Sequence, residues 1–316
     1  MKLRELGRSG IQVPALCFGG NVFGWTVDET RSFALLDALV DAGLNFVDTA
    51  DIYSTWVPGH QGGESETILG RWFAARKNRA KVVLATKVGM PMGEGGKGKT
   101  SLSKKYILQE AEASLRRLQT DYIDLYQSHR DDPDTPQEET LEAYAELIKA
   151  GKVRAIGCSN FTAERIESSL AISAQHNLPC YETAQPEYNL YDRAGFEEKI
   201  EGVCAGHGIG VIPYYSLASG FLSGKYRSEK EIEGRPRAGT LKRYFNERGT
   251  RVLSALDEAA KELHATPAQI SLAWLMQRPA LVAPIASATT VEQLQELVGA
   301  VNLELPTSVV EKLEKA

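Results

Sequence analysis

Four residues of the sequence have side chains that together could perform acid–base chemistry: Asp48, Tyr53, Lys87 and His129. A tyrosine hydroxyl, with an ordinary pKa of about 10, is a poor proton donor near neutrality. A nearby lysine ammonium favours the phenolate and is expected to lower that pKa, and a buried aspartate keeps the lysine charged. A histidine beside them can orient a carbonyl oxygen through a hydrogen bond. The set predicts a site that protonates an oxygen atom.

These side chains can act together only if the secondary-structure elements that carry them bring them close in space. Eight short apolar runs, rich in Val, Ile and Tyr, recur along the chain, which is typical of strands buried on both faces. The runs are Pro14–Phe18, Leu44–Val47, Val82–Thr86, Tyr122–Gln127, Val153–Cys158, Cys180–Ala184, Ile209–Ile212 and Leu281–Ile285.

Longer stretches with helical periodicity lie between the runs. They are Asp28–Ala42, Lys104–Leu118, Glu138–Ala150, Thr162–His176, Asp192–His207, Gly249–Leu263 and Val291–Val301, with an extra helix over Ala268–Gln277. Asp28 is placed to cap the first of them, and Pro267 suits the first turn of the extra helix. Gly151 follows the third stretch, as a helix stop should.

The strand–helix alternation predicts an α/β protein with a parallel sheet, and eight strands are the number that closes a (β/α)8 TIM barrel. An open doubly wound sheet is the main rival, but no clean G-x-G-x-x-G follows the first run. An N-terminal hairpin over Leu3–Leu6 and Ile11–Val13 is expected to cover the barrel floor. Two long loops, Gly89–Ser101 and Leu217–Phe245, extend the opposite face. No linker divides the chain, so residues 1–316 are expected to form a single domain.

In such a barrel, chemistry is found where the C-terminal ends of the strands meet. Each run from the second to the seventh is closed there by a polar or titratable side chain. In chain order these are Asp48, Lys87, Ser128 with His129, Ser159 with Asn160, Gln185 and Tyr214. Tyr53 follows Asp48 in the same loop. No nucleophile, zinc triad or carboxylate pair is evident, so hydrolysis and metal catalysis are weaker interpretations, and no metal is expected.

Composition excludes several function classes. The net charge of −5 over 316 residues disfavours nucleic-acid binding. There is no apolar run of about 18 residues, so no membrane span is expected. The N-terminus lacks a signal-peptide core, and the four cysteines form no C-x-x-C pair. Reduced thiols in a cytoplasmic protein are the expectation.

Several longer motifs of the sequence are FVDTADIYS (46–54), GGESETILGRW (62–72), LATKVG (84–89), SLRRLQTDYIDLYQSHRDD (114–132), IGCSNF (156–161), AQPEYNL (184–190) and SGFLSGKY (219–226). These motifs resemble those of the aldo-keto reductase family, in particular its bacterial members related to potassium-channel beta subunits. They extend over essentially the whole chain and occur in order.

This resemblance implies roles for the residues at the barrel rim. Tyr53 is the general acid in carbonyl reduction, Lys87 held by Asp48 tunes it, and His129 positions the carbonyl of a small aldehyde or ketone. A nicotinamide cofactor, NADPH or NADP, supplies or accepts the hydride. The residues expected to contact it are Ser159, Asn160, Gln185, Tyr214, Ser216, Leu217, Gly220, Lys225, Thr289, Gln293 and Glu296.

The segment Ala286–Gln293 departs from the family pattern, since it has no Arg or Lys to bind the 2′-phosphate of NADPH, and Leu297 replaces a frequent Asn. Basic residues of the second long loop are candidates for the missing charge: Arg227, Arg235, Arg237, Lys242 and Arg243. NADH use therefore stays open. A dehydrogenase of alcohols, sugars or lactols that prefers NAD, and a cofactor-binding redox sensor or regulatory subunit, are the alternative functions.

The substrate pocket is expected to contain Phe23, Trp25, Trp56 and Arg130, with His60 as a further polar candidate. These residues lie in loops at the catalytic rim. They identify no particular carbonyl compound, and nothing in the sequence indicates an oligomeric state.

The stretch Gly93–Thr100, GEGGKGKT, fits the nucleotide-binding pattern G-x-x-x-x-G-K-[ST]. That pattern requires a glycine loop that joins a buried strand tightly to a helix, and a magnesium-binding Asp at another strand end. Five residues separate Lys87 from Gly93, and the nearest candidate, Asp124, is expected in mid-strand. We interpret the match as a coincidence of composition.

Overall fold

A closed ring of eight parallel strands forms the centre of the molecule. The structure is a computed structural model that describes residues 2–316. The strands are β3 (Cys17–Gly19), β4 (Phe46–Asp48), β5 (Val83–Val88), β6 (Ile123–Ser128), β7 (Val153–Ser159), β8 (Thr183–Gln185), β9 (Gly210–Val211) and β10 (Ile285–Ala286). Their order is β10-β3-β4-β5-β6-β7-β8-β9. Val211 pairs in parallel with Leu281, and Ile285 N donates to Pro213 O at 2.9 Å, which closes the ring. The predicted (β/α)8 barrel is confirmed.

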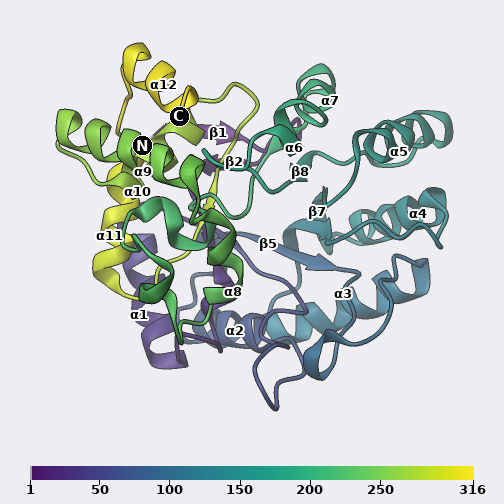
Figure 1. Cartoon of the computed structure of the whole chain (residues 1–316). Coiled ribbons are helices and arrows are strands. Elements are labelled where there is room, and N and C mark those ends of the chain that lie inside the picture. Colours follow the sequence, from purple (N-terminus) through teal and green to yellow (C-terminus); the bar gives the residue numbers. More distant parts are fainter. Residues whose placement is uncertain (1) are drawn as a thin grey trace.

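Helices surround the barrel, as Figure 1 shows. They are α1 (Glu29–Asp41), α2 (Glu64–Arg76), α3 (Lys104–Leu118), α4 (Gln137–Lys149), α5 (Ala163–His176), α6 (Ala194–Glu197), α7 (Glu201–His207), α8 (Ala238–Leu241), α9 (Glu247–Leu263), α10 (Pro267–Met276), α11 (Val291–Ala300) and α12 (Thr307–Glu314). Asp28 caps α1 by accepting from Arg31 N at 2.9 Å. Pro267 occupies the first turn of α10 behind a Thr266–Gln269 capping box.

The N-terminal hairpin covers the floor of the barrel, as expected. Its strands, β1 (Leu3–Glu5) and β2 (Gln12–Pro14), pair antiparallel. Leu6, Ile11 and Val13 are buried against the lower ends of the barrel strands. The guanidinium of Arg4 donates to the carbonyls of Met276, Leu281 and Val282, which fastens the hairpin beside the last strand. The opposite end of the barrel is left for the site.

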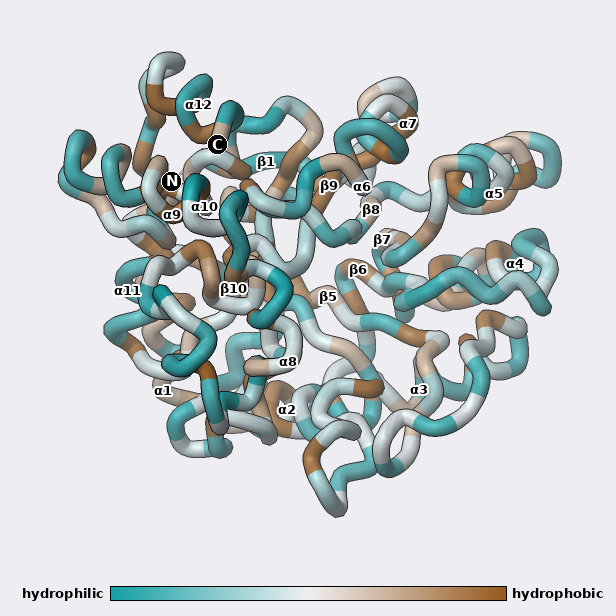
Figure 2. Tube along the Cα trace, in the orientation of Figure 1, coloured by the Kyte–Doolittle hydropathy of each residue, from teal (hydrophilic) through white to brown (hydrophobic). Residues whose placement is uncertain are grey.

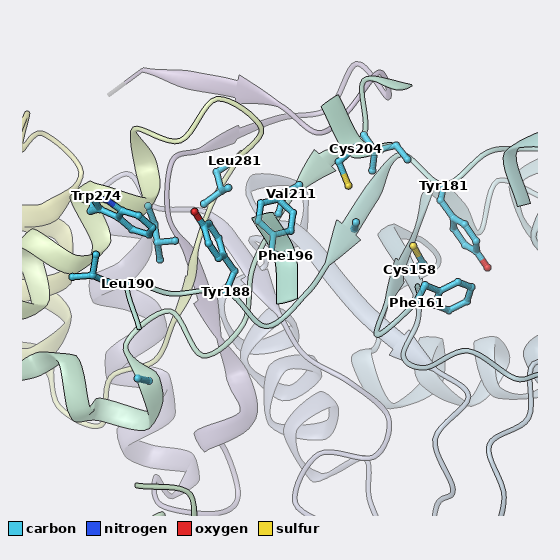
Figure 3. Close-up of a cluster of buried hydrophobic side chains, with 14 of the residues drawn as sticks. Cys158, Phe161, Tyr181, Tyr188, Leu190, Phe196, Cys204, Val211, Trp274 and Leu281 are labelled. Carbon is cyan, nitrogen blue, oxygen red and sulfur yellow. The ribbon is translucent and has the colours of Figure 1, made fainter. Parts of the chain in front are cut away.

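Apolar side chains fill the layer between barrel and helices. In the tube of Figure 2 hydrophobic segments lie on the strands and inner helix faces, while hydrophilic segments lie outside. Figure 3 shows one part of this layer, in which the Tyr188 ring lies 4.6 Å from that of Phe196 and 5.6 Å from that of Trp274. Cys158 and Cys204 are buried in the same cluster. This packing makes the strand ends a rigid support.

Several predicted boundaries were wrong. The first run, Pro14–Phe18, divides between β2 and β3. The helix expected over Asp192–His207 is broken into α6 and α7, and begins late because the Asp192 carboxylate accepts from Asn189 and Tyr244 instead of capping a helix. Helices α2 and α12 were missed. A left-handed Gly63 and the Pro306 backbone precede them, where no side chain caps the first turn.

The second long loop is folded into short helical turns. Between Leu217 and Phe245 lie three 3-10 turns (Ala218–Ser223, Glu229–Ile232 and Lys242–Tyr244) and α8. The Phe221 and Tyr244 rings stack with centroids 5.1 Å apart, and Ile232 and Leu241 are buried. The loop is therefore an ordered cover beside the barrel mouth.

The stretch GEGGKGKT lacks the surroundings of a nucleotide-binding loop. Strand β5 ends at Val88, well before Gly93, and α3 begins only at Lys104. Asp124 lies within β6, where it pairs with Arg79 at 2.8 Å and Arg154 at 2.5 Å. Both findings agree with the interpretation that the match is coincidental.

Helices α2 and α3 meet at Gly70, where a Cβ atom would lie 2.1 Å from Arg117 O. We expect Gly70→Ala to lower the free energy of unfolding by about 1–3 kcal/mol, because the backbones must separate to admit the methyl group. Urea unfolding followed by circular dichroism measures the change. Gly202→Ala in α7 is the matched control, since no atom lies within 4 Å of its Cβ position. Equal stability of both variants would contradict this packing.

Candidate active site

The ammonium of Lys87 lies at the centre of the predicted catalytic group. Its Nζ is 2.5 Å from Asp48 Oδ2 and 2.8 Å from the Tyr53 hydroxyl oxygen, and it donates to Thr49 O at 2.9 Å. A lysine ammonium has three donor hydrogens, so all are used. Lys87 and Asp48 are completely buried. Adjacent strands β4 and β5 hold the pair, since Asp48 is in register with Ala85.

The second oxygen of Asp48 is held by two amides. Gln127 Nε2 of β6 donates to Oδ1 at 3.1 Å, and Gln185 Nε2 of β8 donates to it at 3.0 Å. Gln185 Nε2 also lies 3.2 Å from Gln127 Oε1. The carboxylate therefore receives hydrogen bonds on both oxygens, which fixes its orientation toward Lys87 and Tyr53. Gln127 was not among the predicted site residues. The sequence feature that could have identified it is a polar residue near the end of an otherwise buried strand.

Burial sets the proton affinities of this group. Burial raises the pKa of Tyr53 above its ordinary value. The positive charge of Lys87 opposes that shift, and the negative charge of Asp48 adds to it. The expected lowering was therefore wrong in its net direction, because loss of hydration of the phenolate outweighs the lysine charge. Burial alone would lower the pKa of Lys87, but attraction to Asp48 and Tyr53 raises it. Lys87 is thus cationic and Tyr53 a protonated phenol at neutral pH.

His129 faces the tyrosine from the end of β6, two strands along from β4. It follows β6, and its ring centroid lies 6.0 Å from that of Tyr53. Its backbone is fixed at both ends, since His129 N donates to Val88 O at 2.8 Å and Asn160 Nδ2 donates to His129 O at 2.9 Å. Burial, with the charges of Lys87 and Arg130, lowers the pKa of His129 well below its usual value. The imidazole is therefore neutral and able to donate one hydrogen bond.

A cleft of about 720 Å³ opens above these side chains. Asp48, Tyr53 and His129 line it, with Lys87 buried behind them. Every residue expected to contact a cofactor lines the same cleft, namely Ser159, Asn160, Gln185, Tyr214, Ser216, Leu217, Gly220, Lys225, Thr289, Gln293 and Glu296. The tertiary structure thus brings together residues that are far apart in sequence.

Asn160 connects several of these groups. Its Nδ2 donates to Ser159 Oγ at 3.0 Å, and its Oδ1 accepts from the Tyr214 hydroxyl at 2.8 Å. Ser159 Oγ in turn donates to Gln185 O at 2.8 Å. Asn160 adopts a left-handed backbone with φ of 57°, a conformation that asparagine tolerates better than most residues. The strand ends β7, β8 and β9 are therefore joined into one polar rim.

The expected substrate-pocket residues divide into two groups. Trp25, Trp56 and Arg130 line the cleft, and Trp56 contacts both the Trp25 ring (5.6 Å) and the Tyr53 ring (6.0 Å). Phe23 does not line it: the side chain is completely buried and stacks on Phe18 with centroids 5.6 Å apart. Phe23 therefore belongs to the hydrophobic core, and its inclusion in the pocket was wrong. His60 is also absent from the cleft wall.

Two further findings concern metal-binding clusters and membrane-spanning helices. Within residues 2–316, no group of three or more His, Cys, Asp or Glu side chains is arranged to bind a metal ion. In the same part of the chain, no helix has the length and apolar character to cross a membrane.

The barrel fold, and the polar side chains at the ends of its strands, are those expected of an oxidoreductase family that the sequence comparisons identify. Residues 15–316 match the model of the Aldo/keto reductase family. The chain is 36% identical over 318 residues to "Uncharacterized oxidoreductase YrpG" of Bacillus subtilis, covering 99% of this chain and 95% of that protein. It is 32% identical to "Probable voltage-gated potassium channel subunit beta" of Arabidopsis thaliana (100% and 96% covered). It is 31% identical to "L-glyceraldehyde 3-phosphate reductase" of Escherichia coli (96% and 88% covered). The chain belongs to the aldo/keto reductase family.

Removal of the lysine charge tests the buried ion pair. We expect Lys87→Met to lower the free energy of unfolding by about 3–5 kcal/mol, because Asp48 is left as an uncompensated buried charge. Denaturant unfolding provides the measurement. Lys99→Met is the matched control, since its pair with Asp134 is exposed and 3.7 Å long, and a change within about 0.5 kcal/mol is expected there. The double variant Asp48→Asn/Lys87→Met should recover part of the loss; no recovery would contradict the proposed cause.

Proposed function

We propose that this chain reduces an aldehyde or ketone to the alcohol with NADP(H), with Tyr53 as general acid. The observation that carries the proposal is the buried Lys87 ammonium, 2.8 Å from the Tyr53 hydroxyl oxygen, beneath a cleft that neutral His129 also lines. A phenolate formed at Tyr53 is stabilised by that ammonium. His129 donates a hydrogen bond that orients the carbonyl oxygen.

The residues of the cleft suit a dinucleotide. Its volume is typical of a cofactor site. Ser159, Asn160, Gln185 and Tyr214 line the cleft. In this proposal the first three bind the carboxamide of a nicotinamide, and the Tyr214 ring stacks on it. Such a cofactor supplies the hydride when bound, while Tyr53 donates the proton to the carbonyl oxygen. The products are an alcohol and an oxidised cofactor.

Cationic side chains of the second long loop favour NADP(H) over NAD(H). Lys225, Arg235 and Arg237 line the cleft. The Arg237 guanidinium lies 5.5 Å from the centre of the Trp25 ring and forms no ion pair within residues 2–316. These charges can bind a 2′-phosphate, for which the Ala286–Gln293 segment offers no Arg or Lys. NAD(H) use is the second candidate, because that segment has no basic residue.

A regulatory role is a further candidate. It is favoured by the likeness to proteins named as potassium channel beta subunits. Such a subunit would bind cofactor with very slow turnover. We also propose that residues 1–316 form one domain, and that the chain acts in the cytoplasm, where its four free cysteines stay reduced.

Cofactor titration and turnover test the proposal together. We expect wild type and Tyr53→Phe to bind NADPH within about threefold of each other, because phenylalanine keeps the ring contacts with Trp56 and His129. Reduction of benzaldehyde by Tyr53→Phe should fall by about 10²–10⁴-fold, since the proton donor is lost. Fluorescence titration with NADPH and NADH, followed by absorbance at saturating cofactor, gives both quantities. Binding of neither cofactor would overturn the proposal; tight binding without turnover by wild type would favour the regulatory role.

The pH dependence follows from the proton affinities. A general acid acts in its protonated form, which persists below its pKa, and burial raises the pKa of Tyr53. The lowered pKa keeps His129 neutral above mildly acidic pH. The rate kcat/KM for reduction should therefore stay level from about pH 6 to about pH 9, without the fall that a tyrosine tuned to neutrality would give. A pH–rate profile in a constant-ionic-strength buffer checks this, and a decline centred near pH 7 would contradict it.

A further inference from the structure

The cleft holds an excess of positively charged side chains that form no ion pair with the described part of the protein. Arg116, Arg130, Arg235 and Arg237 are the arginines, among residues 2–316, whose side chains form neither a hydrogen bond nor an ion pair. Three of them line the cleft, as does Lys225. Its only acidic side chains are Glu296 and Asp48, and Asp48 is neutralised by Lys87. The side chains that line the cleft therefore carry a net positive charge, although the whole chain has a net charge of −5.

The isolation of Arg130 has a structural cause, since acids near it in the chain and at the rim are bound elsewhere. Asp131 receives two hydrogen bonds of 2.8 Å from Arg165. Asp132 accepts from Leu102 N at 2.8 Å. Glu187, at the neighbouring rim, is paired with Arg243. The guanidinium is therefore left as an unpaired cation at the cleft surface.

Arg130 is also at the catalytic end of the cleft. It directly follows His129, and its charge helps to lower the pKa of His129 and opposes the rise in the pKa of Tyr214. Trp56, which is 44% exposed, adds an apolar surface beside Tyr53. The basic residues expected near the cofactor phosphates belong to a different segment, the second long loop, of which Lys225, Arg235 and Arg237 line the cleft. Arg130 is thus available to the substrate.

We propose that the substrate carries an anionic group, a phosphate or a carboxylate, besides its carbonyl, and that Arg130 binds this group. The carbonyl oxygen lies at Tyr53 and His129, and the carbon chain crosses Trp56. A guanidinium matches the geometry of either anion with paired hydrogen bonds. This inference rests on the proposed carbonyl reduction and specifies its substrate class.

Matched pairs of aldehydes test the inference with NADPH as cofactor. The phosphate pair is glyceraldehyde 3-phosphate and glyceraldehyde; the carboxylate pair is 4-carboxybenzaldehyde and benzaldehyde. In wild type the anionic member of at least one pair should have the higher kcat/KM. Arg130→Gln should lower the anionic-to-neutral ratio by about 10- to 100-fold, mainly through KM. Arg116→Gln, which removes an equal charge outside the cleft, should leave the ratio unchanged.

Binding supplies a readout without turnover. Protein saturated with NADPH is titrated with glycerol 3-phosphate, 4-(hydroxymethyl)benzoate and glycerol in a calorimeter. We expect wild type to bind one of the two anions, which identifies phosphate or carboxylate, and Arg130→Gln to bind it at least about tenfold more weakly. An unchanged ratio and affinity in Arg130→Gln, or an equal effect of Arg116→Gln, would overturn the inference. Failure of wild type to reduce any of the four aldehydes would instead overturn the proposed reduction, while the calorimetry still decides whether Arg130 binds an anion.

Discussion

The ion pair of Lys87 and Asp48 is the interaction on which the rest of the site depends. Both groups are completely buried, where an unpaired charge costs several kcal/mol. The pair persists because other groups at the strand ends of the barrel hydrogen-bond to it: Thr49 O accepts from the ammonium, and the amides of Gln127 in β6 and Gln185 in β8 donate to the carboxylate. A closed barrel provides these partners, since its strand ends converge from all sides. The Tyr53 hydroxyl contacts the buried Lys87 ammonium and also lines the cleft, so it connects the ion pair to the cleft.

Whereas the charges of Lys87 and Asp48 neutralise each other, most charged side chains that line the cleft form no ion pair within the part of the chain that the structure describes. Elsewhere most arginine side chains have an acidic or carbonyl partner, as in the bidentate contact of Arg165 with Asp131. In the cleft, Arg130, Arg235, Arg237 and Lys225 form no ion pair with the described residues, and three of them come from the second long loop. A protein of net charge −5 thus has a cleft lined mainly by cationic rather than acidic side chains. The apolar layer behind the rim holds this arrangement in place.

Most of the fold could be predicted because the alternation of buried strands and amphipathic helices is a local property of the sequence. Helix α3 was predicted with its observed bounds, and Asp28 and Pro267 marked helix starts through their own backbone and side-chain chemistry. The predicted helix boundaries were wrong where contacts between residues far apart in sequence override local preferences. Asp192 bonds to Tyr244, more than fifty residues away, and so delays the helix that its position predicts.

The sequence by itself determined the residue types at the strand ends, and hence the acid–base chemistry that we predict and the family resemblance. Only the tertiary structure decided which side chains are in the cleft and how strongly each is buried. It placed Phe23 in the core, joined Gln127 to Asp48, and left Arg130 without a partner. It also reversed the expected direction of the Tyr53 pKa shift. The physical reason is that desolvation depends on atoms contributed by many elements, which no local spacing of residues specifies.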